Sequence, residues 1–264
     1  MSRDQTSGLS PRKQGNMHKQ DRAPGAGKVL RDAGSVICLN RDSNLMKLVG
    51  VLAMTCDHVG KKLLPDLLAL QLIGRIAFPL FACCVVLGVL YTRDVRRYAM
   101  RLALAALVSQ PFYVLMGYPA PAAFWENLWR GNVLFTLLLG LCAVWGLHTR
   151  RWWLSAATML LAGLLPVDYG WQGVLLMMVL YGFRENRAAG VLAALVLLGA
   201  GFWEGGPQMR LGPLTLGIQG FSLLALPLLF ASTHSGLRLP RWFFYAYYPA
   251  HMAAIWLLRL ALRR

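Results

Sequence analysis

Long apolar segments recur along this chain beyond Ser43, and short charged connections separate them. Of the 264 residues, 57% are hydrophobic and only 14% are charged, whereas soluble domains carry about 25% charged residues. The apolar runs are too long and too frequent for the core of a soluble domain. The sequence therefore predicts an all-α fold, a polytopic integral membrane helix bundle.

Most of these segments approach the roughly 20 residues that an α-helix needs to cross a bilayer. With the N-terminus inside, the inner connections collect most of the arginines, as the positive-inside rule requires of cytoplasmic loops. We therefore expect a multi-pass membrane protein with a cytoplasmic N-terminus. It would have about nine transmembrane helices, at residues 45–64, 67–91, 98–118, 132–147, 152–165, 171–183, 188–203, 214–231 and 243–262.

The segment before the first of these helices is polar and rich in Arg, Lys, Gly and Ser. We expect residues 1–43 to form a disordered basic cytoplasmic tail, and residues 44–264 to form the transmembrane domain. Much of the net charge of +16 sits in this tail and in the short loops. That placement predicts contact with membrane lipids and no nucleic acid as a partner. The five cysteines show neither CxxC spacing nor histidine clusters, so no metal site and no disulfide are expected.

The first apolar segment carries two adjacent ionisable residues, Asp57 and His58. Each such group costs about 2.5–3.5 kcal/mol at the bilayer centre on insertion scales, so a membrane helix that keeps two must pair them, hydrate them or use them. Histidine is the side chain best suited to moving protons near neutral pH. Asp57 and His58 are therefore the predicted chemical centre, with Arg75 of the next helix at similar depth as a partner for Asp57. A plain Asp–Arg clamp and a satisfied core imidazole remain open.

Other polar residues are expected near the same depth. Asn132 opens one helix from the outer side, and Asp168 lies on an outer turn; both are candidate substrate-binding residues, or merely cap and turn their helices. His251 follows Tyr248 and Pro249 in the last helix, where it either joins the site or only bonds locally at a kink. An inner basic cluster either sets the topology or holds phosphate groups: Arg93, Arg96, Arg97 and Arg101.

Several short strings, taken in order and spacing, resemble the TraX family of conjugative-plasmid membrane proteins, and its TrbP-like members in particular. The match covers residues 45 to about 255 and leaves out the tail. The matching strings are Asp57-His58-Val59-Gly60, Gly74-Arg75-Ile76-Ala77-Phe78-Pro79, Tyr91-Thr92-Arg93, Tyr98, Arg101-Leu102, Ser109-Gln110-Pro111-Phe112, Asn132-Val133-Leu134-Phe135-Thr136, Asp168-Tyr169-Gly170 and Tyr248-Pro249-Ala250-His251.

The resemblance implies an acetyltransferase of the bacterial inner membrane that uses acetyl-CoA to acetylate the N-terminal amine of a pilin subunit. On this interpretation His58 is the general base or a transient acyl acceptor, and Asp57 orients its ring. Arg75 or Asn132 would stabilise the oxyanion. The acceptor would meet Asp168, Tyr169, Tyr248 and His251, and the basic cluster would hold the CoA phosphates. Two other functions stay open: O-acylation of an envelope glycan or lipid, and a non-enzymatic role in pilus assembly.

Overall fold

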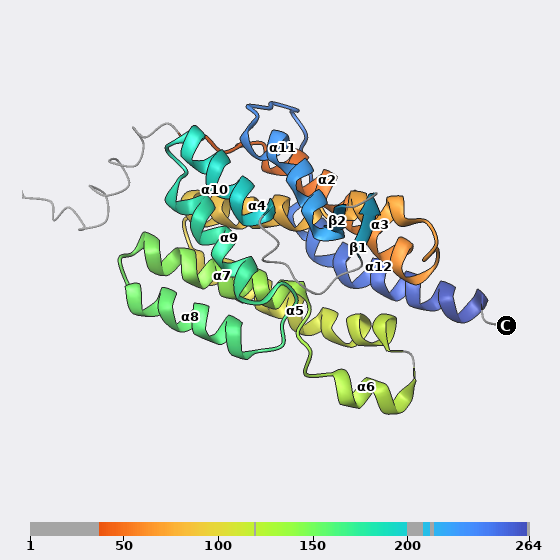
Figure 1. The fold of residues 1–264 in the computed structure, drawn as a ribbon. Helices are drawn as coiled ribbons and strands as arrows, with labels where there is room; N and C mark the ends of the chain where they lie inside the picture. The colour runs from red at the N-terminus through yellow and green to blue at the C-terminus, as the bar shows by residue number, and fades with distance from the viewer. Residues whose placement is uncertain (1–36, 119, 200–207, 212–213, 263–264) are drawn as a thin grey trace, which may run out of the picture. The chain divides into compact units, whose positions relative to one another are not determined.

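The computed structural model describes residues 37–118, 120–199, 208–211 and 214–262 (Figure 1). Residues 1–36 of the predicted tail lie outside the described residues. The last part of that tail belongs to the folded chain, because the backbone N–H of Cys38 donates to the Arg184 carbonyl at 2.7 Å and that of Asn40 to the Leu229 carbonyl at 2.7 Å. The folded part thus begins before residue 44.

The described chain is mostly helical, as predicted. Its elements in order are α2 Ser43–Lys62, α3 Leu68–Gly74, α4 Ala77–Tyr91, α5 Val95–Gly117, α6 Pro121–Asn127, α7 Val133–His148, α8 Trp152–Leu164, α9 Gly170–Gly182, α10 Arg187–Gly199, strands β1 Gln208–Leu211 and β2 Leu214–Gly217, the 3₁₀-helix η2 Ile218–Ala225, α11 Leu226–Phe230 and α12 Arg241–Leu262.

The predicted helix over residues 67–91 is wrong in one respect: it is two helices, α3 and α4, with a turn at Arg75 and Ile76. Pro79 explains the break. Proline has no N–H to donate to the carbonyl four residues earlier, and its ring clashes with that carbonyl, which belongs to Arg75. The turn gives Arg75 a helix-terminal position, from which its side chain reaches both α2 and η2.

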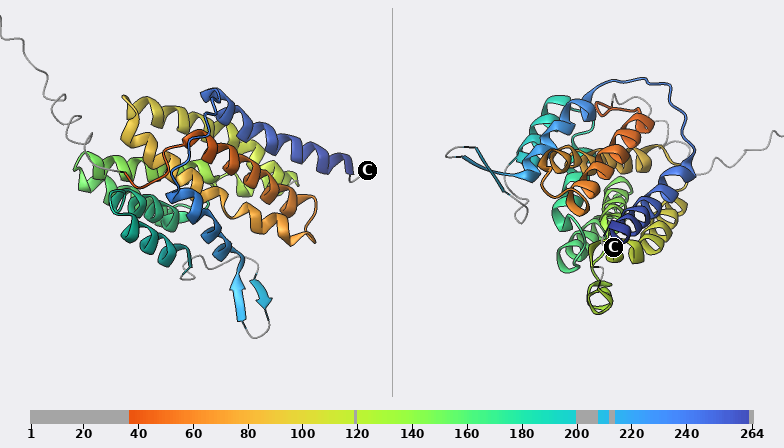
Figure 2. Two further views of the ribbon diagram at one scale, coloured as in Figure 1. Left: turned by 90° about the horizontal axis from the view of Figure 1, so that it is seen from above. Right: turned by 90° about the vertical axis from the view of Figure 1, so that its right-hand side faces the viewer.

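Helix α4 forms the centre of the described bundle. Most of its residues are buried in one hydrophobic cluster, and it packs against α2, α7, α9 and η2. Helix α12 lies beside α2 and α5 (Figures 1 and 2). Helices α2 and α4 run next to each other through the core, and both contribute residues to the two cavities described below.

The predicted helix over residues 214–231 is also wrong in its first half. Residues 208–211 and 214–217 pair as an antiparallel hairpin, with Gln208 opposite Gly217, and Figure 2 shows this hairpin projecting from the helices. The chain then forms η2 and the short α11.

Two helical stretches of the described chain are long and apolar enough to cross a bilayer, Leu68–Tyr91 and Val95–Gly117. Other apolar helices are shorter, at 10–17 residues: Val133–His148, Trp152–Leu164, Gly170–Gly182, Arg187–Gly199 and Ile218–Phe230. The nine-span topology stays a prediction.

Candidate active site

A cavity of about 610 Å³ lies at the C-terminal end of α2. Its volume is within the roughly 300–1,000 Å³ of ordinary ligand pockets. We call it the histidine cavity. Its lining includes polar side chains from α2, from α3 and the turn after it, from the connection before α9, and from η2: Asp57, His58, Lys61, Gln71, Arg75, Asp168, Tyr169 and Gln219.

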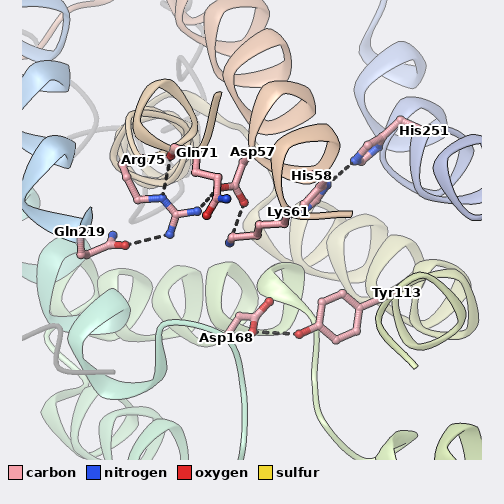
Figure 3. Close-up of polar contacts among 9 residues, drawn as sticks. All are labelled: Asp57, His58, Lys61, Gln71, Arg75, Tyr113, Asp168, Gln219 and His251. Atoms are coloured by element: carbon pink, nitrogen blue, oxygen red, sulfur yellow. Dashed lines mark hydrogen bonds and ion pairs between the residues drawn. The ribbon is translucent and has the colours of Figure 1, made fainter. Parts of the chain in front are cut away.

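Asp57 is the centre of an ion-pair cluster on one wall (Figure 3). Its Oδ1 atom pairs with Nη2 of Arg75, and its Oδ2 atom lies 2.8 Å from Nζ of Lys61. Arg75 also donates from Nε to the Gln71 carbonyl at 3.2 Å and from Nη1 to Oε1 of Gln219 at 3.0 Å. The predicted partnership of Asp57 and Arg75 is therefore present, and one carboxylate serves two cations.

Close helix approach makes this pairing possible. A Cβ atom built on Gly74 would lie 2.3 Å from Cβ of Asp57 and 2.8 Å from its Cα atom. No side chain fits there, so α2 and the end of α3 meet at a distance that only glycine permits. Arg75, the next residue, is consequently held against the Asp57 carboxylate.

His58 faces a different neighbour. Its Nδ1 atom lies 2.8 Å from Nε2 of His251 on α12, and Nδ1 of His251 lies 3.0 Å from the Tyr247 carbonyl. A carbonyl only accepts hydrogen bonds, so Nδ1 of a neutral His251 carries its proton and Nε2 accepts. Nδ1 of His58 is then the donor, which leaves the lone pair of His58 on Nε2. Among the described residues, nothing hydrogen-bonds to that Nε2 atom.

Asp57 and His58 do not form the predicted pair with each other. Successive residues of an α-helix point about 100° apart, and Figure 3 shows Asp57 directed to Arg75 and His58 directed to His251. The ring of His58 is oriented by a second imidazole instead of a carboxylate. The sequence left open whether His251 joins the site or only bonds locally at a kink. In the structure its side chain is 7% exposed and contacts His58.

Asp168 borders the same cavity from the connection between α8 and α9. The Tyr113 hydroxyl donates to its Oδ1 atom at 2.9 Å, and the hydroxyl of Thr136 donates to its backbone carbonyl. Burial raises the pKa of Asp168, while the hydrogen bond from Tyr113 and the charge of Lys61 act in the opposite direction. Tyr169 beside it has a left-handed backbone, with φ of 62°, and stacks on Phe78 at 3.9 Å between ring centroids.

Asn132 is fully buried and lies outside both cavities described here. Its Oδ1 atom caps α7 by accepting from the Leu134 N–H at 2.9 Å, and its Nδ2 atom donates to the Ala106 carbonyl and to Oε1 of Gln110, each at 2.9 Å. The amide is therefore already hydrogen-bonded on both its atoms. The capping alternative describes Asn132, and the structure offers it no route to an oxyanion.

A second cavity of about 510 Å³ lies at the other end of α2. We call it the basic cavity, because Arg41, Lys47 and Arg101 are among its lining residues. Of the predicted phosphate-binding cluster, only Arg101 lines it. The other three line neither cavity and are exposed: Arg93, Arg96 and Arg97. Nε of Arg97 pairs with Oδ2 of Asp94 at 3.0 Å.

The two cavities share four lining residues, Met54, Phe81, Val133 and Tyr248. Met54 and Tyr248 belong to one buried hydrophobic cluster, and Phe81 and Val133 pack against it. Tyr248, predicted to contact substrate, is thus 5% exposed in the wall between the cavities.

Sequence reasoning missed several residues of these sites. Lys61 and Lys47 were not among the predicted site residues, although Lys61 follows Asp57 by four residues, the spacing of a helical ion pair. Tyr113 and Gln219 gave no signal. The Nε2 atom of Gln219 is buried with no hydrogen-bond partner among the described residues, so this cavity holds a polar donor that is available to a ligand.

Comparison with known proteins supplies the family context. A family model described as "TraX protein" matches residues 42–259. The chain is 29% identical over 225 residues to the "Probable fimbrial assembly protein FimC, serogroup H1" of Dichelobacter nodosus. The alignment covers 80% of this chain and 92% of that protein. The chain is also 29% identical over 228 residues to a "Protein TraX" of Escherichia coli, with 82% and 87% covered. For the TraX protein of strain K12 the identity is 31% over 160 residues, with 59% and 60% covered. No solved structure matches the chain significantly.

Proposed function

Because this chain belongs to the TraX family, we propose that it is a membrane-embedded acetyltransferase that moves an acetyl group from acetyl-CoA to the N-terminal amine of a pilin subunit. The relative named for fimbrial assembly supports pilin as the acceptor. One observation carries the chemistry: His58, on the wall of a sizeable cavity, is held by His251 in the tautomer that keeps Nε2 basic.

The surface of the described helices supports a position within the inner membrane. Large apolar side chains are exposed along α5, α8, α10 and α12, where a soluble protein would place polar ones. They include Met100, Leu104, Leu107, Leu160, Leu164, Leu192, Val196, Leu257 and Leu262. At 1.5 Å per residue, α2 is about 30 Å long, close to the hydrocarbon thickness of a bilayer. We propose about nine spans with the N-terminus in the cytoplasm.

In the proposed reaction, Nε2 of His58 acts as the general base. The amine nitrogen attacks the thioester carbonyl carbon, the C–N bond forms, and the C–S bond breaks. His58 accepts the proton that the nitrogen loses and returns it to the sulfur, so that an amide and a thiol are formed. When Nε2 of His58 takes up a proton, Nδ1 of the same ring still donates to Nε2 of His251, and this hydrogen bond stabilises the imidazolium. The planes of the two rings are parallel to within 6°.

Charge in the cavity suits both partners of this reaction. Lys61 and Arg75 bring two cations to the wall beside Asp57, and with Gln219 Nε2 they supply donors for the oxygen that becomes negative as the amine attacks. Asp168, which lines the cavity and lies below the Asp57 cluster in Figure 3, is the carboxylate that would bind the ammonium form of the acceptor before its nitrogen loses one proton to water. Asp57 is a positioning residue, because it holds the two cations and contacts neither reactant.

Intact-mass analysis of the cognate pilin tests the proposal. Pilin from cells with the gene should carry one acetyl group at its N-terminus, and pilin from cells that express His58→Ala should lack it. Glycan or lipid acetylation that follows the gene while pilin mass does not change would identify a different acceptor. A His58→Ala protein that inserts normally and still supports wild-type acetylation would remove the general-base mechanism, and normal pilus assembly without any acetylation would indicate a non-enzymatic role.

A further inference from the structure

The basic cavity has a composition that the histidine cavity lacks: cations without acidic partners. Arg41 lies over the ring of Tyr91 at 5.3 Å, and Lys47 over the ring of Phe244 at 5.4 Å. No acidic side chain of the described chain lies within ion-pair distance of Arg41, Lys47 or Arg101. Asp42, the nearest acid in sequence to Arg41, accepts instead from the backbone N–H groups of Leu45 and Ser235.

Three cations around one cavity, unneutralised by the protein, favour an anionic ligand. Two of the three cations, Arg41 and Lys47, also have an aromatic neighbour. Aromatic faces hold two of the side chains by cation–π contact, a use of lysine and arginine that leaves N–H donors for a second partner. A phosphate or diphosphate group is the ligand that such a set of donors recognises best.

The two cavities lie end to end along the same helices. On α2, Ser43 to Met54 line the basic cavity and Met54 to Lys61 line the histidine cavity. On α4, which runs beside α2, the order is reversed: Ala77 to Phe81 border the histidine cavity and Phe81 to Tyr91 the basic one. The cavities therefore meet at Met54 and Phe81, near the middle of both helices.

We propose that the basic cavity binds the phosphorylated end of the acyl donor, and that the thioester arm crosses the shared wall between Met54, Phe81 and Tyr248 to reach His58. This inference rests on the proposed function for the identity of the donor. It assigns the anion site to Arg41, Lys47 and Arg101, which line the basic cavity, in place of Arg93, Arg96 and Arg97, which do not. It also explains why a donor from one side of the membrane meets an acceptor at the other end of α2.

A binding experiment tests the anion site without any reference to the acceptor. The full-length protein in phosphatidylcholine nanodiscs is titrated with CoA, and with pantetheine, which has the same thiol arm but no phosphate. Arg41→Gln, Lys47→Gln and Arg101→Gln should each weaken CoA binding about tenfold, the size of one charge-assisted hydrogen bond. Arg187→Gln removes an exposed arginine that lines neither cavity and should leave CoA binding unchanged.

Turnover provides the second measurement. With acetyl-CoA and S-acetylpantetheine as alternative donors, the wild type should prefer acetyl-CoA in kcat/KM, and each of the three variants should lose about tenfold of that preference. Weaker CoA binding in the variants, even if pilin proves not to be the acceptor, would support the anion site and refute only the proposed function.

Pilin acetylation by variants that bind CoA as tightly as the wild type would overturn the anion site and keep the function. A third outcome is that the wild type shows no CoA affinity in phosphatidylcholine nanodiscs, while the three variants lose bound phosphatidylglycerol. The cations would then hold a lipid headgroup, and the inference would be overturned.

Discussion

The two cavities of this protein treat charge in opposite ways. In the histidine cavity the cations Lys61 and Arg75 are neutralised in part by Asp57, and the histidines bond each other. In the basic cavity, Arg41 and Lys47 lie over aromatic rings and have no acidic partner in the described chain. Helices α2 and α4 contribute to the lining of both cavities.

This difference separates positioning from binding. A cluster whose charges are already paired has a fixed geometry before any ligand arrives, which suits groups that must meet a reacting centre. A cavity with unpaired cations needs an anion to complete it, which suits recognition of a ligand that comes and goes. The comparison predicts that changes in the histidine cavity affect turnover or folding, and that changes in the basic cavity affect donor affinity.

The largest effect is expected for His58→Ala. Loss of a general base typically lowers a rate by about 10²–10⁴, and here it should lower kcat without weakening CoA binding at the other cavity. Purified protein and a pilin N-terminal peptide would give both numbers. His234→Ala removes an exposed histidine of the connection before α12 and is the matched control. A loss in CoA affinity as large as the loss in kcat would merge the two cavities into one site.

Asp57→Asn should instead affect folding. The side chains of Asp57 and Arg75 are 10% and 11% exposed, so the variant leaves a buried guanidinium without its counter-charge, a change that costs about 3–5 kcal/mol. Reversible unfolding in mixed micelles measures this loss. The comparison variant is Asp94→Asn, whose partner Arg97 is 77% exposed; an exposed pair of this kind contributes about 0–1 kcal/mol. Equal losses in the two variants would contradict the assignment of Asp57 to a buried cluster.

Asn132→Ala distinguishes a structural residue from a chemical one. The variant loses the cap of α7 and the two buried hydrogen bonds from Nδ2, which should destabilise the protein by about 2 kcal/mol while the folded fraction keeps its kcat/KM. An unfolding titration and a specific-activity measurement on the same sample decide the matter. If Asn132 were the oxyanion donor that its position in the sequence suggested, activity would fall about 10²–10³-fold at unchanged stability.

Much of the fold followed from hydrophobic segmentation alone. Most of the predicted helices between residues 45 and 203 begin and end within a few residues of observed ones, because their ends are marked by polar or charged residues such as Lys62 and Asn132. The break at Arg75 was missed although Pro79 marks it, since an apolar run hides a turn that only the proline rule reveals. The β-hairpin was missed because segment hydropathy does not distinguish a strand from a short helix over residues 214–217.

The candidate site was only half accessible from the sequence. Depth along a membrane helix brought Asp57, Arg75 and His58 to one level, and the structure keeps them there. Their pairing depends on direction around the helix and on which neighbour lies there. The contact of His58 with His251 joins residues 193 positions apart. No local pattern encodes it, and the single sequence left the role of His251 open.

Met54→Phe gives the smallest expected effect and examines the point where the two cavities meet. Met54 is 7% exposed and lines both cavities, so the rigid ring of phenylalanine replaces a flexible thioether in the passage proposed for the thioester arm. Turnover should fall about tenfold, equal to about 1.4 kcal/mol in the transition state, while CoA still binds the basic cavity.

Leu52→Phe is the control for Met54→Phe, because Leu52 lies two residues earlier on α2 and is 58% exposed. Turnover should not change in this variant. Wild-type turnover in Met54→Phe would mean that the donor reaches His58 by another route. The histidine cavity would then have to admit both reactants from its own opening, and the contrast between paired and unpaired charge would no longer correspond to two ends of one path.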